Sequence, residues 1–502
     1  MSVSQGMILL DVTIVNVALP SIQGELHMSQ GRLEWVISAY ALTLATLIPF
    51  GGTLGDRLGR KKIFLFGLVV FTIASAGCAL STSDLMLIGF RVLQGVGGAV
   101  MSALTLSILT EAYPPERRAG AIGIWAAVSG LGFGAGPIVG GILLSFADWS
   151  SIFWVNVPIG VAGIIVGIVG IQESRDPLAR PLDLVGSGLC MAALFGITLG
   201  LIQSSSSSWG SPAVLVPFLT GLVLLGAFAQ WERRVAHPMA PPDLLKTPGF
   251  RRSCVAFLFA YASFTTVMFY VTLLFQDVKG WSPLRTGLTW LIMNGPFLIA
   301  AQFAGRLHQR LSSRTVIGIG LFTAAIGIFG LSQVTTTTDF ALTAVGYALL
   351  GAGFGLFVPA VSTAAMAEVP TGFSGIASGI LNASRQVGTS IGLAVLGTIG
   401  AAAAKSAWSS HVAQLPAAQQ AVGHSLGSGV AGGQVTQVQQ SLGAGSVNAA
   451  SSSFLHGYKI AVGLSALLLV VAAGATLAGA LRRGPDAARV PDRERVTAEG
   501  AT

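Results

Sequence analysis

Charged side chains are scarce in this chain. Asp, Glu, Lys and Arg make up 10% of its 502 residues, while apolar residues reach 52%. Soluble proteins contain roughly 25% charged residues, and a soluble protein of this length could not cover its surface with so few charges. The composition therefore excludes a soluble protein and predicts a polytopic membrane protein.

Cysteine and histidine are also rare, and nucleotide-binding motifs are missing. The three cysteines, Cys78, Cys190 and Cys254, fall in apolar segments without C-x-x-C spacing, and the six histidines form no metal-binding pattern. The sequence contains no G-x-x-x-x-G-K-S/T run and no H-E-x-x-H motif. We therefore expect no metal, no cofactor, no ATP, no nucleic acid partner and no enzyme activity.

Long apolar segments occupy most of the chain. Fourteen of them are about 20 residues long, the length that crosses ~30 Å of hydrocarbon. They lie near residues 3–23, 33–53, 63–82, 85–110, 119–145, 152–171, 184–203, 212–231, 254–275, 286–306, 315–333, 340–365, 374–402 and 457–481. The predicted fold is an all-α polytopic membrane protein with 14 transmembrane helices, two six-helix bundles plus two inserted helices.

Two imperfect copies of one helical unit support this division. The run Gly52–Lys61 aligns with Gly305–Arg314, and Gly95–Gly98 aligns at nearly the same offset with Gly351–Phe354. Duplicated bundles are typical of secondary transporters, whose substrate site lies between the repeats. The predicted parts are an N-terminal six-helix bundle at 1–172, a two-helix insert with cytoplasmic linkers at 173–252, a C-terminal six-helix bundle at 253–482, and a cytoplasmic tail at 483–502. The C-terminal bundle includes a long external loop at 403–456, for which we expect mobility and some helix.

The basic residues predict an orientation. If both termini are cytoplasmic, most of the 28 lysines and arginines fall in inner loops or in the tail, where membrane proteins carry an excess of them. We therefore expect a multi-pass protein of the cell inner (plasma) membrane with both termini in the cytoplasm. It would be a monomer whose partners are the lipid bilayer, protons and a small-molecule substrate.

Asp11 is the only carboxylate placed well inside a predicted span. A carboxylate in hydrocarbon must be protonated or paired, so Asp11 is either a proton-binding group or an interfacial Asp near the inner mouth. The first span is also short, because Met7 to Pro20 gives about 21 Å of helix unless Val3 to Gly6 are included. We expect either a native start further upstream or a short first helix shielded by its neighbours.

Arg91 lies within the fourth span, in the run Arg91-x-x-Gln94-Gly95. A guanidinium in hydrocarbon is unfavourable by a few kcal/mol and usually faces a cavity or a partner. Arg91 is therefore either a functional charge or a structural one bonded to backbone carbonyls.

The turn between the second and third spans interleaves glycines with charged residues. Glycine permits a tight turn and close helix approach, and Asp56 can cap the start of the third span. A loop that only sets orientation would explain the basic residues but not the glycines and the Asp. The motif comprises Gly52, Leu54, Asp56, Arg57, Gly59, Arg60 and Lys61.

The fifth span ends in a glycine-rich stretch. Gly132, Gly136 and Gly140 recur every four residues, so they share one smooth helix face that allows close packing. Pro137 removes a helix hydrogen bond and kinks the helix, and Gly141 follows Gly140. The face is either a sliding contact used in transport or ordinary helix packing.

These motifs resemble those of the major facilitator superfamily. The run at 52–61 resembles its signature loop, whose Asp takes part in an inter-bundle contact that holds the outward-open state. The run at Arg91 resembles its fourth-helix motif, whose Arg is implicated in proton coupling, and the Gly-Pro-x-x-Gly-Gly end of the fifth span resembles the motif of antiport exporters. The segments 10–20, 149–160 and 382–388 resemble motifs of its fourteen-span drug/proton antiporters.

The resemblance implies roles for whole helices. Asp11 and Arg91 would couple transport to protons, spans 1, 4, 9 and 12 would line a central cavity, and spans 2, 5, 10 and 13 would rock at the bundle interface. Aromatic rings on spans 9 and 12, Phe269 and Tyr270 among them, would face an apolar substrate, or else lipid or core. The candidate cavity residues are Asn16, Gln94, Tyr261, Phe264, Asn294, Phe354, Phe357, Asn382 and Arg385.

The predicted function is secondary active export. Small amphipathic or apolar compounds, such as drugs and antibiotics, would leave the cell in exchange for protons by alternating access. The alternatives are a dedicated exporter of one endogenous metabolite or self-made antibiotic, an importer, which the Gly-Pro motif disfavours, and a membrane enzyme or scaffold. Few acidic residues lie along the predicted path, so a strict requirement for cationic drugs is not indicated.

Overall fold

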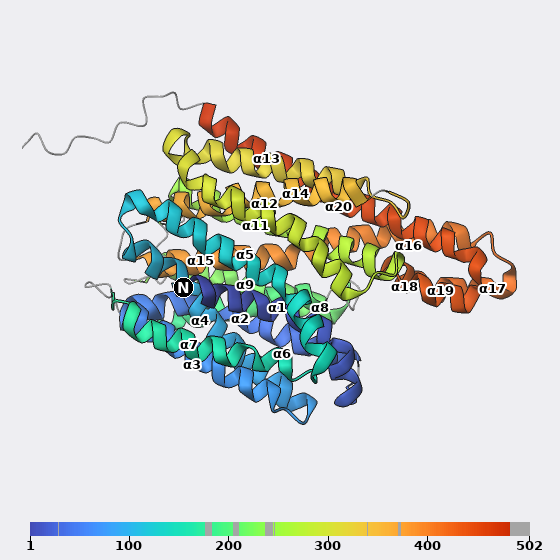
Figure 1. Cartoon of the computed structure of the whole chain (residues 1–502), viewed down its shortest axis with the longest axis horizontal. Helices are drawn as coiled ribbons and strands as arrows, with labels where there is room; N and C mark the ends of the chain where they lie inside the picture. The colour runs from blue at the N-terminus through green and yellow to red at the C-terminus, as the bar shows by residue number, and fades with distance from the viewer. Residues whose placement is uncertain are drawn as a thin grey trace, which may run out of the picture.

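The computed structural model describes residues 1–28, 30–175, 183–203, 210–235, 244, 246–338, 340–369 and 373–481. Within these residues, 14 helical segments are long and apolar enough to cross a membrane, which confirms the predicted number of spans. The long helices run side by side through the body of the molecule (Figure 1). The predicted tail at 483–502 lies outside the described residues.

The first six spans form one bundle, and its sixth span is divided into α6 and α7. The helices are α1 (Ser2–Glu25), α2 (Gln30–Leu58), α3 (Arg60–Ala79), α4 (Asp84–Ala112), α5 (Pro115–Phe146), α6 (Ser151–Trp154) and α7 (Asn156–Gly170).

The last six spans form the second bundle, in which short π-helical segments continue two of the helices. The elements are α11 (Pro248–Leu273) with η1 (Leu274–Val278), α12 (Pro283–Arg310), α13 (Ser313–Ser332), α14 (Phe340–Ala367), α15 (Ser374–Ile391) with η3 (Gly392–Gly397) and α16 (Thr398–Val412), and α20 (Val447–Leu481).

The two bundles repeat one pattern of helix contacts. In the first bundle, α1 packs on α5. Helices α2 and α3 pack on α4, and α3 also packs on α7. In the second bundle, α11 packs on α15 in the same way, α12 and α13 pack on α14, and α13 also packs on α20. A Cβ at Gly97 would lie 2.6 Å from the carbonyl oxygen of Gly67, and one at Gly353 would lie 2.6 Å from that of Gly320. Only glycine permits such close approach, so the aligned glycine runs occupy equivalent places in the two copies.

Smaller contacts join α4 to α15 and α5 to α14, but the bundles meet chiefly along two helix pairs, α2 with α15 and α5 with α12. These are the second, thirteenth, fifth and tenth spans, the four expected at the interface. The inserted helices α8 (Leu184–Gln203) and α9 (Pro212–Glu232) pack on each other, and α8 also packs on α2 and α15. The insert therefore lies beside one of the two main contacts between the bundles.

The predicted external loop at 403–456 is largely helical. Its first part continues α16 to Val412, and α17 (Ala417–Ser425), α18 (Gly427–Ala431), α19 (Val435–Leu442) and the short η4 (Ala444–Ser446) follow before α20 begins. Trp408, Val412, Val430 and Val438 form a small apolar core there. The segment projects from one end of the molecule (Figure 1). Its helices agree with the expectation of some helix, whereas its apolar core was not predicted.

Helix ends follow local sequence rules. Proline, which needs no intrahelical N–H partner in the first turn, opens α5, α9, α11 and α12. The side chains of Ser83, Ser282 and Ser312 cap α4, α12 and α13 by accepting backbone N–H groups. Gly59, with a φ of 106°, separates α2 from α3.

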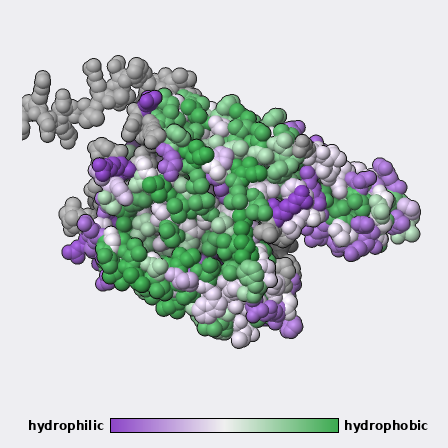
Figure 2. All heavy atoms as spheres, viewed as in Figure 1, coloured by the Kyte–Doolittle hydropathy of each residue, from purple (hydrophilic) through white to green (hydrophobic). Residues whose placement is uncertain are grey.

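The molecular surface fits a bilayer. Apolar residues cover the body, whereas hydrophilic ones gather toward its two ends (Figure 2). Large apolar side chains that are more than half exposed lie on outward faces of several spans, for example Val169, Val223, Ile299 and Phe329. Lipid rather than water is the solvent that such a surface suits.

The first span is not short. Helix α1 includes Val3 to Gly6 and continues past Pro20 to Glu25, so its 24 residues extend about 36 Å. This length is enough to cross ~30 Å of hydrocarbon.

Candidate functional site

A cavity of about 570 Å³ lies between the two bundles, in the size range of small-molecule sites. Its wall comes from α1, α2 and α5 of the first bundle and from α11, α12, α14 and α15 of the second. Within the described residues, α4 contributes only Arg91 to the wall. Spans 1, 9 and 12 were expected there, but span 4 contributes much less than the family pattern implied. The interface helices α2, α5, α12 and α15 line the cavity as well.

Aromatic rings cover the second-bundle side of the cavity. Tyr261 stacks on Phe257 with ring centres 5.7 Å apart, and Phe354 lies 5.9 Å from Tyr261 and 4.9 Å from Phe264. All four rings belong to the cavity wall. Such a surface suits an apolar or aromatic ligand, because offset and edge-to-face contacts stabilise ring pairs.

A buried ion pair lies beside this cavity. Arg91 Nη1 donates to Asp11 Oδ2 at 2.6 Å, and the two side chains are 1% and 0% exposed. The other oxygen of Asp11 accepts from Gln94 Nε2 at 2.9 Å and from Asn156 Nδ2 at 3.0 Å. Since Asp11 is fully enclosed, the structure contradicts the alternative of an interfacial Asp at the inner mouth.

Arg91 is held from several helices at once. Its Nε donates to the carbonyl oxygen of Val36 at 2.9 Å, its Nη1 donates to Gln94 Oε1 at 2.7 Å, and its guanidinium lies 4.2 Å from the centre of the Tyr40 ring. Arg91 was expected to be either a functional charge or a structural one bonded to backbone carbonyls. Both interpretations find support, because Arg91 bonds the carbonyl of Val36 and the carboxylate of Asp11. Removing either charge would leave the other buried and uncompensated, at a cost of about 3–5 kcal/mol.

Asp56 joins the two bundles at the end of α2. Its Oδ1 accepts from Arg60 Nε at 2.7 Å, and its Oδ2 accepts from the backbone N–H of Ile376, in the first turn of α15, at 3.0 Å. The expectation that Asp56 caps the third span is wrong, since it caps α15, where the positive helix end favours a carboxylate. An inter-bundle contact by this Asp was implied by the family resemblance.

The rest of the motif supports this contact. Gly52, Leu54 and Arg57 belong to the last turns of α2 rather than to a loop. Arg60 is 1% exposed and also pairs with Glu111 of α4, so it is held inside the first bundle. Glu173 accepts from the backbone N–H groups of Lys61 and Lys62, and it would collide with a side chain at Gly59.

We predict that Asp56→Ala loosens this end of the molecule. Loss of a cap typically weakens a contact by about 0.5–2 kcal/mol, so the population open at this end should rise by about two- to thirtyfold. The measurement is the alkylation rate of a cysteine at Ser378, which is fully buried on α15. Arg57→Ala, which removes an exposed charge from the same motif, should leave the rate unchanged. An unchanged rate in Asp56→Ala would contradict a locking role.

The glycine face of α5 packs within the first bundle. A Cβ at Gly132 would lie 2.6 Å from the Cα of Gly6, one at Gly136 would lie 2.9 Å from the backbone nitrogen of Ile14, and one at Gly140 would lie 3.0 Å from Ile14 Cγ1. All of these neighbours belong to α1, so this face is not a sliding contact between the bundles. Gly141 is only partly buried.

Other residues of α5 face the second bundle. A Cβ at Gly123 would lie 2.8 Å from the carbonyl oxygen of Ala301, and one at Gly130 would lie 2.8 Å from the Phe297 ring. Pro137 is part of the cavity wall. The face of Gly132, Gly136 and Gly140 therefore packs against α1, the helix of Asp11, while Gly123, Gly130 and Pro137 lie against α12.

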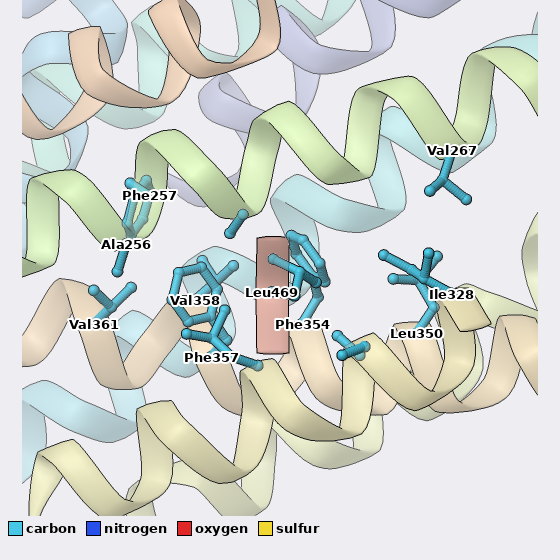
Figure 3. Packing of buried hydrophobic residues seen from close by; sticks show 14 of the residues in the cluster. Ala256, Phe257, Val267, Ile328, Leu350, Phe354, Phe357, Val358, Val361 and Leu469 are labelled. Carbon is cyan, nitrogen blue, oxygen red and sulfur yellow. The ribbon is translucent and has the colours of Figure 1, made fainter. Parts of the chain in front are cut away.

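Six of the nine candidate cavity residues belong to the wall: Asn16, Tyr261, Phe264, Asn294, Phe354 and Arg385, and Phe269 joins them. Three expectations are wrong. Gln94 is fully buried in the Asp11 network, Phe357 is fully buried in the core between α11 and α13 (Figure 3), and Asn382 donates to the carbonyl oxygen of Ser102 at the bundle interface. Tyr270 is also buried, and it donates to the carbonyl oxygen of Gly397.

Several residues of the site escaped the sequence analysis. Asn156 fell within a matched motif, but nothing there connected it to Asp11. Ser75 accepts from Gln94 and Asn156, and Tyr40 lies against Arg91, yet both are ordinary residues of apolar spans. Trp125 and Trp290 belong to the cavity wall, and a tryptophan in a span gives no sign of which way it faces.

Comparison with known proteins identifies the family and the fold. A sequence profile of the Major Facilitator Superfamily matches residues 1–393. Two solved structures share the fold: the human organic anion transporter MFSD10 (15% identity, TM-score 0.60, 93% of this chain and 98% of that chain) and the proton:xylose symporter XylE (14% identity, TM-score 0.60, 94% and 93%). At these identities the likeness shows the fold alone.

Curated relatives are closer in sequence. The chain is 32% identical over 348 residues to the tetracenomycin C resistance and export protein of Streptomyces glaucescens, covering 69% of this chain and 65% of that protein, just under two thirds of its length. It is 35% identical over 350 residues to the methylenomycin A resistance protein of Streptomyces coelicolor (68% and 73%), and 33% identical over 353 residues to the drug efflux pump JefA of Mycobacterium tuberculosis (69% and 68%). The chain therefore belongs to the major facilitator superfamily.

Proposed function

We propose that this protein is a secondary active exporter that moves small amphipathic or apolar compounds out of the cell in exchange for protons. The observation that carries the proposal is the Asp11–Arg91 ion pair, which is buried beside an aromatic cavity and shares Arg91 with the cavity wall. Ionisable residues buried in membrane proteins commonly mark proton or substrate paths. The names of the relatives, which are resistance and export proteins, support the direction of transport.

The ion pair offers a way to couple the two fluxes. A proton that binds Asp11 neutralises the carboxylate, so the bond from Arg91 Nη1 loses most of its strength. Arg91 is then held chiefly by the carbonyl of Val36 and the Tyr40 ring, both on α2. Because α2 also forms the contact with α15, a change in this bond can alter the packing of the two bundles.

Alternating access would use the Asp56 contact as its inner closure. With both termini in the cytoplasm, the bond from Ile376 to Asp56 lies on the cytoplasmic side and holds the bundles together there. The structure then represents a state closed toward the cytoplasm. Loading from the cytoplasm requires this contact to break while the bundles rock around the cavity.

The substrate range has two candidates. A multidrug exporter would accept many unrelated apolar compounds, as the name of the JefA relative, a drug efflux pump, suggests. A dedicated exporter would accept one endogenous metabolite or antibiotic, as the names of the tetracenomycin and methylenomycin relatives suggest. A cavity lined by aromatic rings suits both, so only the breadth of transported compounds separates them.

Everted membrane vesicles test the proposal. After respiration has acidified the interior, adding tetracenomycin C or methylenomycin A should release protons from vesicles that contain this protein. Vesicles from cells with an empty vector provide the control. Transport of a compound without proton movement would contradict antiport, and the absence of both with every compound would contradict export.

A further inference from the structure

The cavity carries one positive charge that the protein does not neutralise. Arg91 and Arg385 are the charged side chains of its wall, and no acidic side chain belongs to the wall within the described residues. Arg91 is paired with Asp11, whereas none of the ion pairs between described residues involves Arg385. The site as a whole therefore has an excess of one positive charge.

Arg385 also has a hydrogen-bond donor, its Nε, without an acceptor in the described part of the chain. The residue is 6% exposed. Its guanidinium carbon lies 5.6 Å from the centre of the Tyr261 ring, one of the aromatic rings of the wall. Buried charged groups are normally paired and hydrogen-bonded, so an unpaired guanidinium at a cavity needs an explanation.

A second buried donor of the wall is also unpartnered. Trp125 is 3% exposed and its indole N–H has no acceptor among the described residues. Arginine and tryptophan side chains can only donate hydrogen bonds, so both groups lack the same thing, an acceptor oxygen. A ligand that supplies negatively charged oxygen would satisfy Arg385, and its flat rings would lie against Tyr261, Phe264 and Phe354.

We propose that the cavity selects aromatic compounds that carry an anionic group, such as a carboxylate, and that Arg385 binds this group. The inference rests on the proposed export function and specifies its substrate class. Cationic compounds would meet repulsion from Arg385 in a poorly solvated site, where charges interact strongly. Specificity would then come from the guanidinium, and most of the affinity from the rings.

Equilibrium binding to the purified protein in detergent tests the proposal without any transport. The probes are a radiolabelled anthraquinone carboxylic acid and its primary amide, which share rings and size but differ in charge near neutral pH. The wild-type protein should bind the acid more tightly than the amide. Arg385→Gln should weaken binding of the acid by about ten- to a hundredfold, because a hydrogen bond to a charged group is lost, while the amide changes little.

Two further variants isolate the charge. Arg385→Lys should keep a preference for the acid, since it keeps the positive charge. Phe264→Leu should weaken both probes alike, because it changes the aromatic wall and not the charge. Equal affinity of the wild-type protein for acid and amide, or a preference that survives Arg385→Gln, would overturn the proposal.

The outcome is separable from the proposed function. Binding is measured without a membrane or a proton gradient, so antiport in vesicles with no preference for the acid would refute only the substrate class. A preference lost in Arg385→Gln without proton movement in vesicles would refute only antiport.

Discussion

Asp11→Asn is expected to abolish proton-coupled efflux while the protein still inserts into the membrane. Asparagine keeps the size of the side chain and can still accept hydrogen bonds from Gln94 and Asn156, which now bond the carboxylate, but it cannot bind and release a proton. Substrate-driven proton release in everted vesicles should fall to the empty-vector level. Substrate binding to the purified variant should persist, because Asp11 is not part of the cavity wall.

The substitution also leaves Arg91 without its counter-charge, which is expected to destabilise the fold by about 3–5 kcal/mol. The double variant Asp11→Asn/Arg91→Gln removes both charges, so it should recover stability without recovering proton release. Asp84→Asn, at an exposed ion pair with Arg32, should behave like the parent. Proton release at the parental rate by the stable double variant would show that coupling takes place elsewhere.

The sequence predicted the architecture well because membrane spans are specified by hydropathy and length. All fourteen spans, the duplicated bundles and the inserted pair were found. The apolar core within 403–456 was not predicted for a physical reason: Trp408 and Val412 lie about 20 to 30 residues from Val430 and Val438 along a polar sequence, and only the folded chain brings them together. The predicted first span at 3–23 agrees closely with helix α1, which runs from Ser2 to Glu25.

The sequence correctly identified those residues of the site whose charge is unfavourable in hydrocarbon. Asp11 and Arg91 stood out because a buried charge needs a partner, and each proved to be the partner of the other. The errors concern residues whose presence in a span is unremarkable. Gln94, Phe357 and Asn382 were assigned to the cavity, but spans that are apolar on every side carry little information about which face points inward.

The glycine motif of α5 likewise could not be assigned to a partner helix from the sequence. Its spacing correctly predicted a smooth face, yet spacing cannot identify the helix that covers the face. The contact with α1 assigns this motif a role in positioning Asp11, and the contact between bundles involves Gly123 and Gly130 instead. This changes the expected consequence of a substitution at Gly136.

Gly136→Val is expected to abolish efflux by displacing α1. The added Cβ would lie 2.7 Å from Thr13 Cβ and 2.9 Å from the backbone nitrogen of Ile14, distances at which a backbone must move. Thr13 is two residues from Asp11, so the shift should distort the ion pair with Arg91. Overpacking of this kind typically destabilises by about 1–3 kcal/mol, so thermal stability in detergent should fall together with efflux.

Two matched valine substitutions on α5 distinguish a face that positions α1 from a face that slides during transport. A Cβ at Gly120 has no neighbour within 4 Å, so Gly120→Val should behave like the parent in both stability and efflux. A Cβ at Gly123 meets the carbonyl oxygen of Ala301 on α12 at 2.8 Å, so Gly123→Val should reduce efflux by hindering the contact between bundles while the Asp11–Arg91 pair is undisturbed. If Gly136→Val proved as stable as the parent and lost only efflux, the glycine face would move during transport, and the static contact between α5 and α1 would be only one stage of the cycle.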